Sequence, residues 1–127
     1  MARIFITGSA DGLGKLTARQ LIAEGHNVVL HARNADRAKT ANEQVPGAED
    51  VLIADLADIE QVQKLADEAN TLSRFDAVIH NAGVMGVSSE QIFAVNSLAP
   101  FALTALMKTP KRMLKLQKKQ AYLSKHS

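Results

Sequence analysis

The residues most suggestive of chemistry are three glycines near the start of the chain, in the segment Thr7-Gly8-Ser9-Ala10-Asp11-Gly12-Leu13-Gly14. Gly8 permits a tight exit from a strand, Gly12 leaves room for a ligand phosphate beside the backbone, and Gly14 lets a helix lie close to a sheet. Free N–H groups and the dipole at such a helix start favour a diphosphate. The alternative is a turn that uses glycine for its geometry alone.

Other polar residues follow apolar runs farther along the chain. Arg33 comes after the second run, Asp55-Leu56 after the third, and Asn81-Ala82-Gly83 after the fourth. In a parallel sheet the carboxyl ends of the strands meet at one edge, which is where ligands bind in open α/β sheets.

Strand-like and helix-like segments alternate along the chain. We expect strands at residues 3–7, 28–30, 50–54 and 75–79, and helices from 12 to 24, from 34 or 35 to 44, from 58 to 72 and from 90 to 107. This alternation predicts an α/β fold built from βαβ units, a Rossmann-like doubly wound parallel sheet with strand order 3-2-1-4. A fifth strand from Arg112 to Leu116 is possible. The side chains expected to face inward are Leu13, Leu16, Ala18 and Leu21 in the first helix and Ile59, Val62, Leu65 and Ala66 in the third.

Taken together, these motifs over roughly residues 2–107 resemble the short-chain dehydrogenase/reductase family, whose cofactor turn reads Thr-Gly-x-x-x-Gly-x-Gly. Asp55-Leu56 is similar to the family's acidic residue near adenine, Asn81-Ala82-Gly83 to its Asn-Ala-Gly loop, and Asn96 to its active-site Asn, which supports a proton relay to a catalytic Lys. The resemblance implies a dinucleotide held by Gly8, Ser9, Asp11, Gly12, Leu13, Gly14, Arg33, Asp55, Leu56, Asn81, Ala82 and Gly83.

The second strand ends in Leu30-His31-Ala32-Arg33-Asn34, without the acid that would hold the ribose hydroxyls of NAD. Arg33 could pair with the 2′-phosphate of NADP, or it could be a solvated residue in a turn. Asp11 counts slightly against NADP. We predict NADP, with NAD as the alternative. We interpret His31 and His80, near strand ends, as packed or hydrogen-bonded, and we expect no metal.

Pro100 has no N–H to donate to the carbonyl of Asn96, so the helix over 90–107 should kink there. The alternative is an Asn that caps or bends a helix in which local packing tolerates the proline. This helix is apolar on most sides and needs cover beyond one sheet face. Because family members commonly pair through it, the resemblance implies a homo-oligomer.

The family's catalytic Ser, Tyr and Lys have no convincing counterpart in the chain. Tyr122 is the only tyrosine, and Lys125 follows it at three residues rather than four. The resemblance implies an NAD(P)-dependent oxidoreductase that moves a hydride between nicotinamide and a carbonyl or alcohol carbon of a small molecule, truncated before its catalytic region. The alternatives are a non-catalytic dinucleotide-binding module and an interaction protein.

Composition and charge limit the remaining possibilities. Of 127 residues, 46% are hydrophobic, 4% are aromatic and none is cysteine. Residues 1–107 carry 8 Lys and Arg against 13 Asp and Glu, a net charge of −5, whereas residues 108–127 carry 7 Lys and Arg and no acid, a net charge of +7. We expect a dinucleotide-binding domain over 1–107, a divergent basic tail over 108–127, a cytoplasmic location and no membrane span. The basic tail could contact nucleic acid or an acidic surface, but sparse aromatic residues disfavour nucleic acid, and a solvated end is the favoured interpretation.

Overall fold

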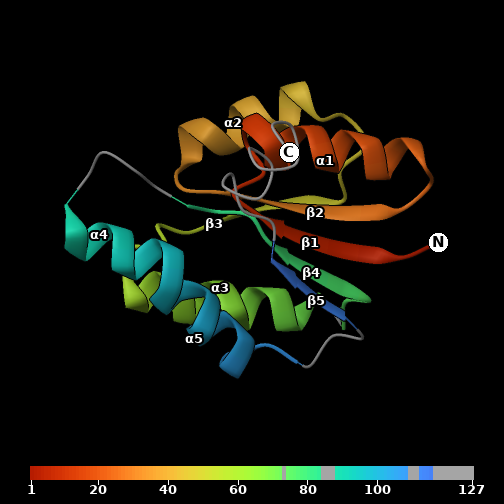
Figure 1. Ribbon diagram of the computed structural model, residues 1–127. Helices are drawn as coiled ribbons and strands as arrows, with labels where there is room; N and C mark the ends of the chain where they lie inside the picture. Colours follow the sequence, from red (N-terminus) through yellow and green to blue (C-terminus); the bar gives the residue numbers. More distant parts are fainter. Residues whose placement is uncertain (73, 84–87, 109–111, 116–127) are drawn as a thin grey trace, which may run out of the picture.

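The computed structural model describes residues 1–72, 74–83 and 88–108, and the backbone of 112–115. Within these ranges five strands form one parallel sheet in the order β3-β2-β1-β4-β5 (Figure 1). They are β1 (Arg3–Thr7), β2 (Asn27–Ala32), β3 (Asp50–Ile53), β4 (Ala77–His80) and β5 (Arg112–Lys115). The predicted order is confirmed, and the possible fifth strand pairs with β4. The division of the chain at residue 107 stays a prediction.

Helices cover both faces of this sheet (Figure 1). On one side lie α1 (Gly12–Ala23) and α2 (Ala35–Gln44), and on the other α3 (Ile59–Thr71), α4 (Ser89–Phe93), the π-helical η1 (Ala94–Leu98) and α5 (Ala99–Leu106). Each face has its own apolar core. Val28 and Leu30 of β2 pack in the core beneath α1 and α2, and Val29 packs in the core toward α3 and α5. Burial on both faces explains why the strands are continuously apolar.

Two of the side chains expected to face inward are exposed instead. Leu16 of α1 is 58% exposed, because the buried stripe of this helix runs through Gly14 and Ala18, one helical turn apart. Ile59 is 43% exposed as the first residue of α3, whose buried stripe begins at Val62. Strand β4 also begins later than predicted, at Ala77 rather than residue 75.

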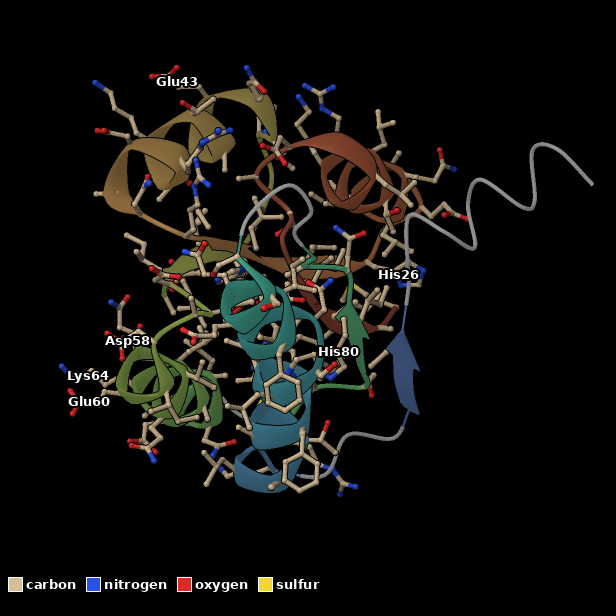
Figure 2. The ribbon with its side chains drawn as sticks, turned by 60° about the vertical axis from the view of Figure 1, so that its left-hand side comes forward. His26, Glu43, Asp58, Glu60, Lys64 and His80 are labelled. Atoms are coloured by element: carbon tan, nitrogen blue, oxygen red, sulfur yellow. The ribbon has the colours of Figure 1, made fainter. Side chains whose placement is uncertain are left out.

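The predicted cap of α3 is confirmed, since the Asp58 carboxylate accepts a hydrogen bond from the Glu60 N–H at 3.0 Å. Figure 2 shows Asp58 at the start of this helix, with Glu60 and Lys64 pointing away from the molecule. The polar side of α3 therefore faces outward while Val62 and Leu65 enter the core.

The helix expected over 90–107 is interrupted where the proline predicts it. Residues 94–98 are π-helical, and the N–H of Ala99 donates to the carbonyl of Ala94, five residues back. An α-helical register would leave the Asn96 carbonyl facing Pro100, which has no N–H. The wider turn is a recognised way to accommodate such a break. No described helix is long and apolar enough to cross a membrane.

Candidate cofactor site

The loops after β1, β2, β3 and β4 surround a cavity of about 480 Å³ at the carboxyl edge of the sheet. The predicted residues that line it are Gly8, Asp11, Leu13, Arg33, Asp55, Leu56, Asn81, Ala82 and Gly83. Other lining residues are Ala10, His31, Ala32, Arg37, Ala57, Gln91 and Val95. Ser9, Gly12 and Gly14 belong to the turn that shapes the cavity, and Asn96 is also outside its lining.

The three glycines of the turn have different spatial requirements. Gly8 has φ +64°, and a Cβ there would come within 2.8 Å of the Ala82 Cα. A Cβ on Gly14 would overlap the Gly8 carbonyl oxygen and the Asn81 side-chain nitrogen. Gly12 has φ +58°, and a Cβ on it would meet nothing within 4 Å. The first and third glycines thus allow close packing, while the second borders open space of the kind that a phosphate could fill.

The N-terminus of α1 differs from those of the helices around it. Side chains of Asn34, Asp58 and Ser88 accept hydrogen bonds from the first turns of α2, α3 and α4. Asp11 occupies the same position before α1, yet its side chain makes no capping hydrogen bond. The first N–H groups of α1 therefore have no side-chain cap among the described residues, which is the arrangement that anion-binding helix starts use.

A buried hydrogen-bond network fixes the turn. The Ser9 hydroxyl donates to the Ile6 carbonyl at 2.8 Å and accepts from the His31 N–H at 2.8 Å. The His31 ring then joins two strand ends: its Nδ1 accepts from the Gly8 N–H at 2.9 Å, and its Nε2 lies 2.8 Å from the Ala54 carbonyl oxygen. This pattern requires a neutral ring with its proton on Nε2. The predicted interpretation of His31 as a hydrogen-bonded histidine is confirmed.

Burial lowers the pKa of His31 below its ordinary value, because the buried ring loses the hydration of its charged form. The hydrogen bond to the Ala54 carbonyl and the charge of Asp55 oppose this effect and only partly offset it. The ring therefore stays neutral at neutral pH. His80, the last residue of β4, is buried as well (Figure 2).

Thr7 and Asn81 join the glycine turn to the loop after β4. The Thr7 hydroxyl accepts from the N–H groups of Asn81 and Ala82, both at 3.2 Å, and the Asn81 side-chain nitrogen donates to the Gly8 carbonyl at 3.0 Å. The side-chain oxygen of Asn81 is buried and has no hydrogen-bond partner among the described residues. A buried acceptor of this kind is rare unless a ligand or water completes it.

Asn96 lies in η1 beside the Asn81-Ala82-Gly83 loop. A Cβ placed on Gly83 would be 3.4 Å from the Asn96 side-chain oxygen. The structure thus brings together two of the predicted motifs that are far apart in the sequence. Asp55 is partly committed to its own turn, because its carboxylate accepts from the Ala57 N–H at 2.9 Å.

Two arginines reach the cavity from the segment after β2. Arg33 is the predicted one, and it is exposed. Arg37, in the first turn of α2, was not singled out from the sequence; its guanidinium pairs with the Asp11 carboxylate at 2.7 Å. The signal that could have found it is the cap residue Asn34, which fixes the start of α2 and hence the side of the first turn that faces the glycine loop.

Several sequence-based predictions are not tested by the described residues. Tyr122 and Lys125 lie outside the described residues, as do residues 109–111 and 116–127 of the basic tail. No group of three metal-ligating side chains occurs within the described ranges. A second hollow, of about 640 Å³, lies between α1 and the end of α2. The guanidinium of Arg19, which lines it, donates two hydrogen bonds to the Gln44 carbonyl.

A parallel sheet with a glycine turn between its first strand and first helix, and a cavity across its carboxyl edge, defines a Rossmann-like domain. The chain belongs to the short-chain dehydrogenase family, whose model matches residues 2–120. An uncharacterized oxidoreductase of Emericella nidulans is 55% identical over 124 residues, which cover 90% of this chain and 49% of that protein. The short-chain dehydrogenase chry4 of Gibberella zeae is 49% identical over 90% of this chain and 47% of its own length.

Among solved structures, an active-site complex of Pseudomonas aeruginosa RhlG with NADP superposes with a TM-score of 0.72 at 25% identity, covering 84% of this chain and 46% of that one. This chain therefore spans about half the length of the proteins that it matches.

Proposed function

We propose that the protein binds an NAD(P) dinucleotide in the cavity at the carboxyl edge of the sheet, with NADP(H) preferred over NAD(H). The observation that carries the proposal is the start of α1, where uncapped N–H groups border open space beside Gly12. Relatives named as oxidoreductases and dehydrogenases, and a neighbour solved with NADP, support it.

In this proposal, different residues of the cavity bind different parts of the dinucleotide. The N–H groups of Gly12, Leu13 and Gly14 hold the diphosphate, as helix starts do for anions. Arg33 pairs with the 2′-phosphate, and Asp55 with Leu56 borders adenine. The unpartnered oxygen of Asn81 completes its hydrogen bonds on the nicotinamide side, near Ala82 and Gly83.

The reaction that we propose is that of an NAD(P)-dependent oxidoreductase acting on a small carbonyl compound or alcohol. Bound NADPH supplies the hydride in such a reaction. The described residues bind and orient the dinucleotide, and Asn96 supports a proton path beside the Gly83 loop. A cytoplasmic location stays a prediction from the lack of cysteine.

Titration with NADPH tests this function. We expect an enhanced nicotinamide fluorescence, a raised unfolding temperature, and weaker binding of NADH under the same conditions. A folded protein that gives neither signal with either nucleotide would contradict the proposal. Turnover on a panel of aldehydes and ketones then separates an oxidoreductase from a non-catalytic binding module, which would bind NADPH without consuming it.

We also propose self-association through the helical segment 89–106. Its outer side exposes Phe93, Leu98, Phe101 and Leu106, with Phe101 72% exposed. Contiguous exposed apolar patches mark protein–protein interaction sites. We expect Phe101→Glu to lower the mass measured by light scattering, with NADPH binding retained. Leu16→Glu, on the exposed side of α1, is the matched control and should leave the mass unchanged.

A further inference from the structure

Gln61, in the first turn of α3, makes a hydrogen bond that a helix-capping glutamine does not normally make. It follows the cap residue Asp58 by three positions, where a Glu or Gln side chain usually accepts from the N–H of the cap residue itself. Here the Asp58 N–H donates to the Asp55 carbonyl at 3.0 Å, and the Gln61 side-chain oxygen accepts from the Asp55 N–H at 2.7 Å. The side chain therefore reaches past its own helix start to the loop that borders the cavity.

This hydrogen bond completes a clamp on the peptide group between Ala54 and Asp55. The Ala54 carbonyl oxygen lies 2.8 Å from Nε2 of the buried His31, on β2. At the other end of the same peptide group, the Asp55 N–H donates to Gln61, on α3. The amide nitrogen of Gln61 donates to the Asp58 carboxylate at 3.3 Å, which keeps its oxygen turned toward Asp55. Because both ends of a planar peptide group are held, the direction in which the Asp55 side chain leaves the backbone is fixed.

The Asp55 carboxylate is the group that this clamp orients. Its Oδ1 accepts from the Ala57 N–H at 2.9 Å, and within the described residues no donor bonds to its Oδ2. Asp55 lines the cavity together with the apolar side chains of Leu56, Ala57 and Val95. A carboxylate oxygen beside apolar walls suits a flat heterocycle with an exocyclic amino group, because the amino group donates a hydrogen bond while the ring packs.

We propose that Gln61 is a positioning residue for base recognition: it holds the Asp55 peptide so that Asp55 Oδ2 accepts a hydrogen bond from the adenine amino group of the bound dinucleotide. This inference rests on the proposed dinucleotide site, in which Asp55 borders adenine. Gln61 does not line the cavity, so its effect on the base should depend on Asp55. Without the Gln61 side chain the Asp55 N–H loses its partner, and the carboxylate no longer faces the base in one fixed direction.

Titration with NADPH and with its hypoxanthine analogue tests the proposal. The analogue carries a carbonyl oxygen in place of the adenine amino group, so it presents an acceptor to Asp55 where NADPH presents a donor. We expect wild-type protein to bind NADPH about 10-fold more tightly than the analogue, the effect of one hydrogen bond to a charged group. We expect Gln61→Ala to reduce this ratio to about 3-fold or less, through weaker binding of NADPH. The ratio does not depend on stability, because both ligands are measured on the same folded preparation.

Four further variants separate positioning from a purely structural role. Gln61→Met, which fills similar space without an amide, should lower the ratio as Gln61→Ala does. Gln61→Glu keeps an oxygen that accepts from the Asp55 N–H, and it should restore part of the ratio. Gln63→Ala removes a glutamine that is exposed on the same helix and does not line the cavity, and it should leave the ratio at the wild-type value. In Asp55→Ala, which removes the proposed acceptor, adding Gln61→Ala should change the ratio no further.

The outcomes distinguish this inference from the proposed function. Wild-type protein that binds NADPH and its analogue equally, or a ratio that the Gln61 variants lower no more than Gln63→Ala does, overturns the inference and leaves the dinucleotide site standing. A further fall in the ratio when Gln61→Ala is added to Asp55→Ala also overturns it, because Gln61 would then act on the base without Asp55. Wild-type protein that binds neither nucleotide overturns both.

Discussion

Replacing Gly14 with alanine is expected to abolish NADPH binding and to lower the free energy of unfolding by about 1–3 kcal/mol. A Cβ at this position would overlap the Gly8 carbonyl oxygen and the Asn81 side-chain nitrogen, which are themselves hydrogen-bonded to each other. The clash involves backbone, so it can be relieved only by moving α1 away from the turn. Chemical denaturation and NADPH titration of the same preparation measure the two effects.

Two other glycines provide the controls for this variant. Gly12→Ala and Gly25→Ala both place a side chain at positive φ, at +58° and +93°, where a Cβ meets nothing within 4 Å. Each should cost about 1–2 kcal/mol from backbone strain alone. Only Gly12→Ala should also weaken NADPH binding, because Gly25 lies at the opposite end of α1. If the Gly14→Ala variant has the stability and the NADPH affinity of the wild-type protein, the turn does not pack against α1 as described above.

Replacing His31 with leucine is expected to lower the free energy of unfolding and to abolish NADPH binding. The substitution leaves the Gly8 N–H and the Ala54 carbonyl without the ring that joins them, at a cost of about 1–3 kcal/mol for each buried group. It also frees the glycine turn from β3, so NADPH binding should be lost. His31→Gln, whose side-chain amide offers both a hydrogen-bond acceptor and a donor, should restore part of the stability and part of the NADPH binding. His26→Gln, a histidine that bonds the Ala2 N–H away from the cavity, is the control.

The same histidine predicts how stability depends on pH. Burial lowers the pKa of His31 in the folded state, so as pH falls through about 6.5, the ordinary value, the unfolded chain takes up a proton first. Stability from this group is complete above pH 6.5 and declines below it until the folded pKa is reached, by at most about 1.4 kcal/mol per pH unit. Unfolding temperatures from pH 7.5 to 5 should fall less steeply in His31→Gln. Identical slopes would contradict this role.

Much of the fold follows from local patterns in the sequence. Short apolar runs alternate with periodic segments, and this alternation with right-handed crossovers leaves the confirmed order of strands as the natural arrangement. The break near Asn96 was also predictable, because Pro100 lacks the N–H that an α-helix requires. The exposure of Leu16 was not, since apolar character alone does not reveal which helical stripe meets the sheet.

In the candidate site, too, some residues can be predicted from local sequence patterns and others cannot. Glycines and the polar residues just after strands could be found because their positions are fixed by the strand ends themselves. His31 and Arg37 acquire their roles from partners 22 to 26 residues away, and no local pattern encodes such distances. The interpretation of Asp11 as mildly unfavourable for NADP stays a prediction, and its contact with Arg37 gives it a physical basis.

The bonds that shape the cavity also bear on how the chain reaches its native state. Thr7 and Asn81 are 74 residues apart in sequence, and Gly8 and His31 are 23 apart. Contacts of such separation form only after large loops have closed, so the cavity is complete only once β1 has paired with both β2 and β4. A dinucleotide that binds in this cavity would bind only the folded protein, and it would therefore shift the unfolding equilibrium toward the folded state. Nucleotide supply would then govern how long the polypeptide survives proteolysis.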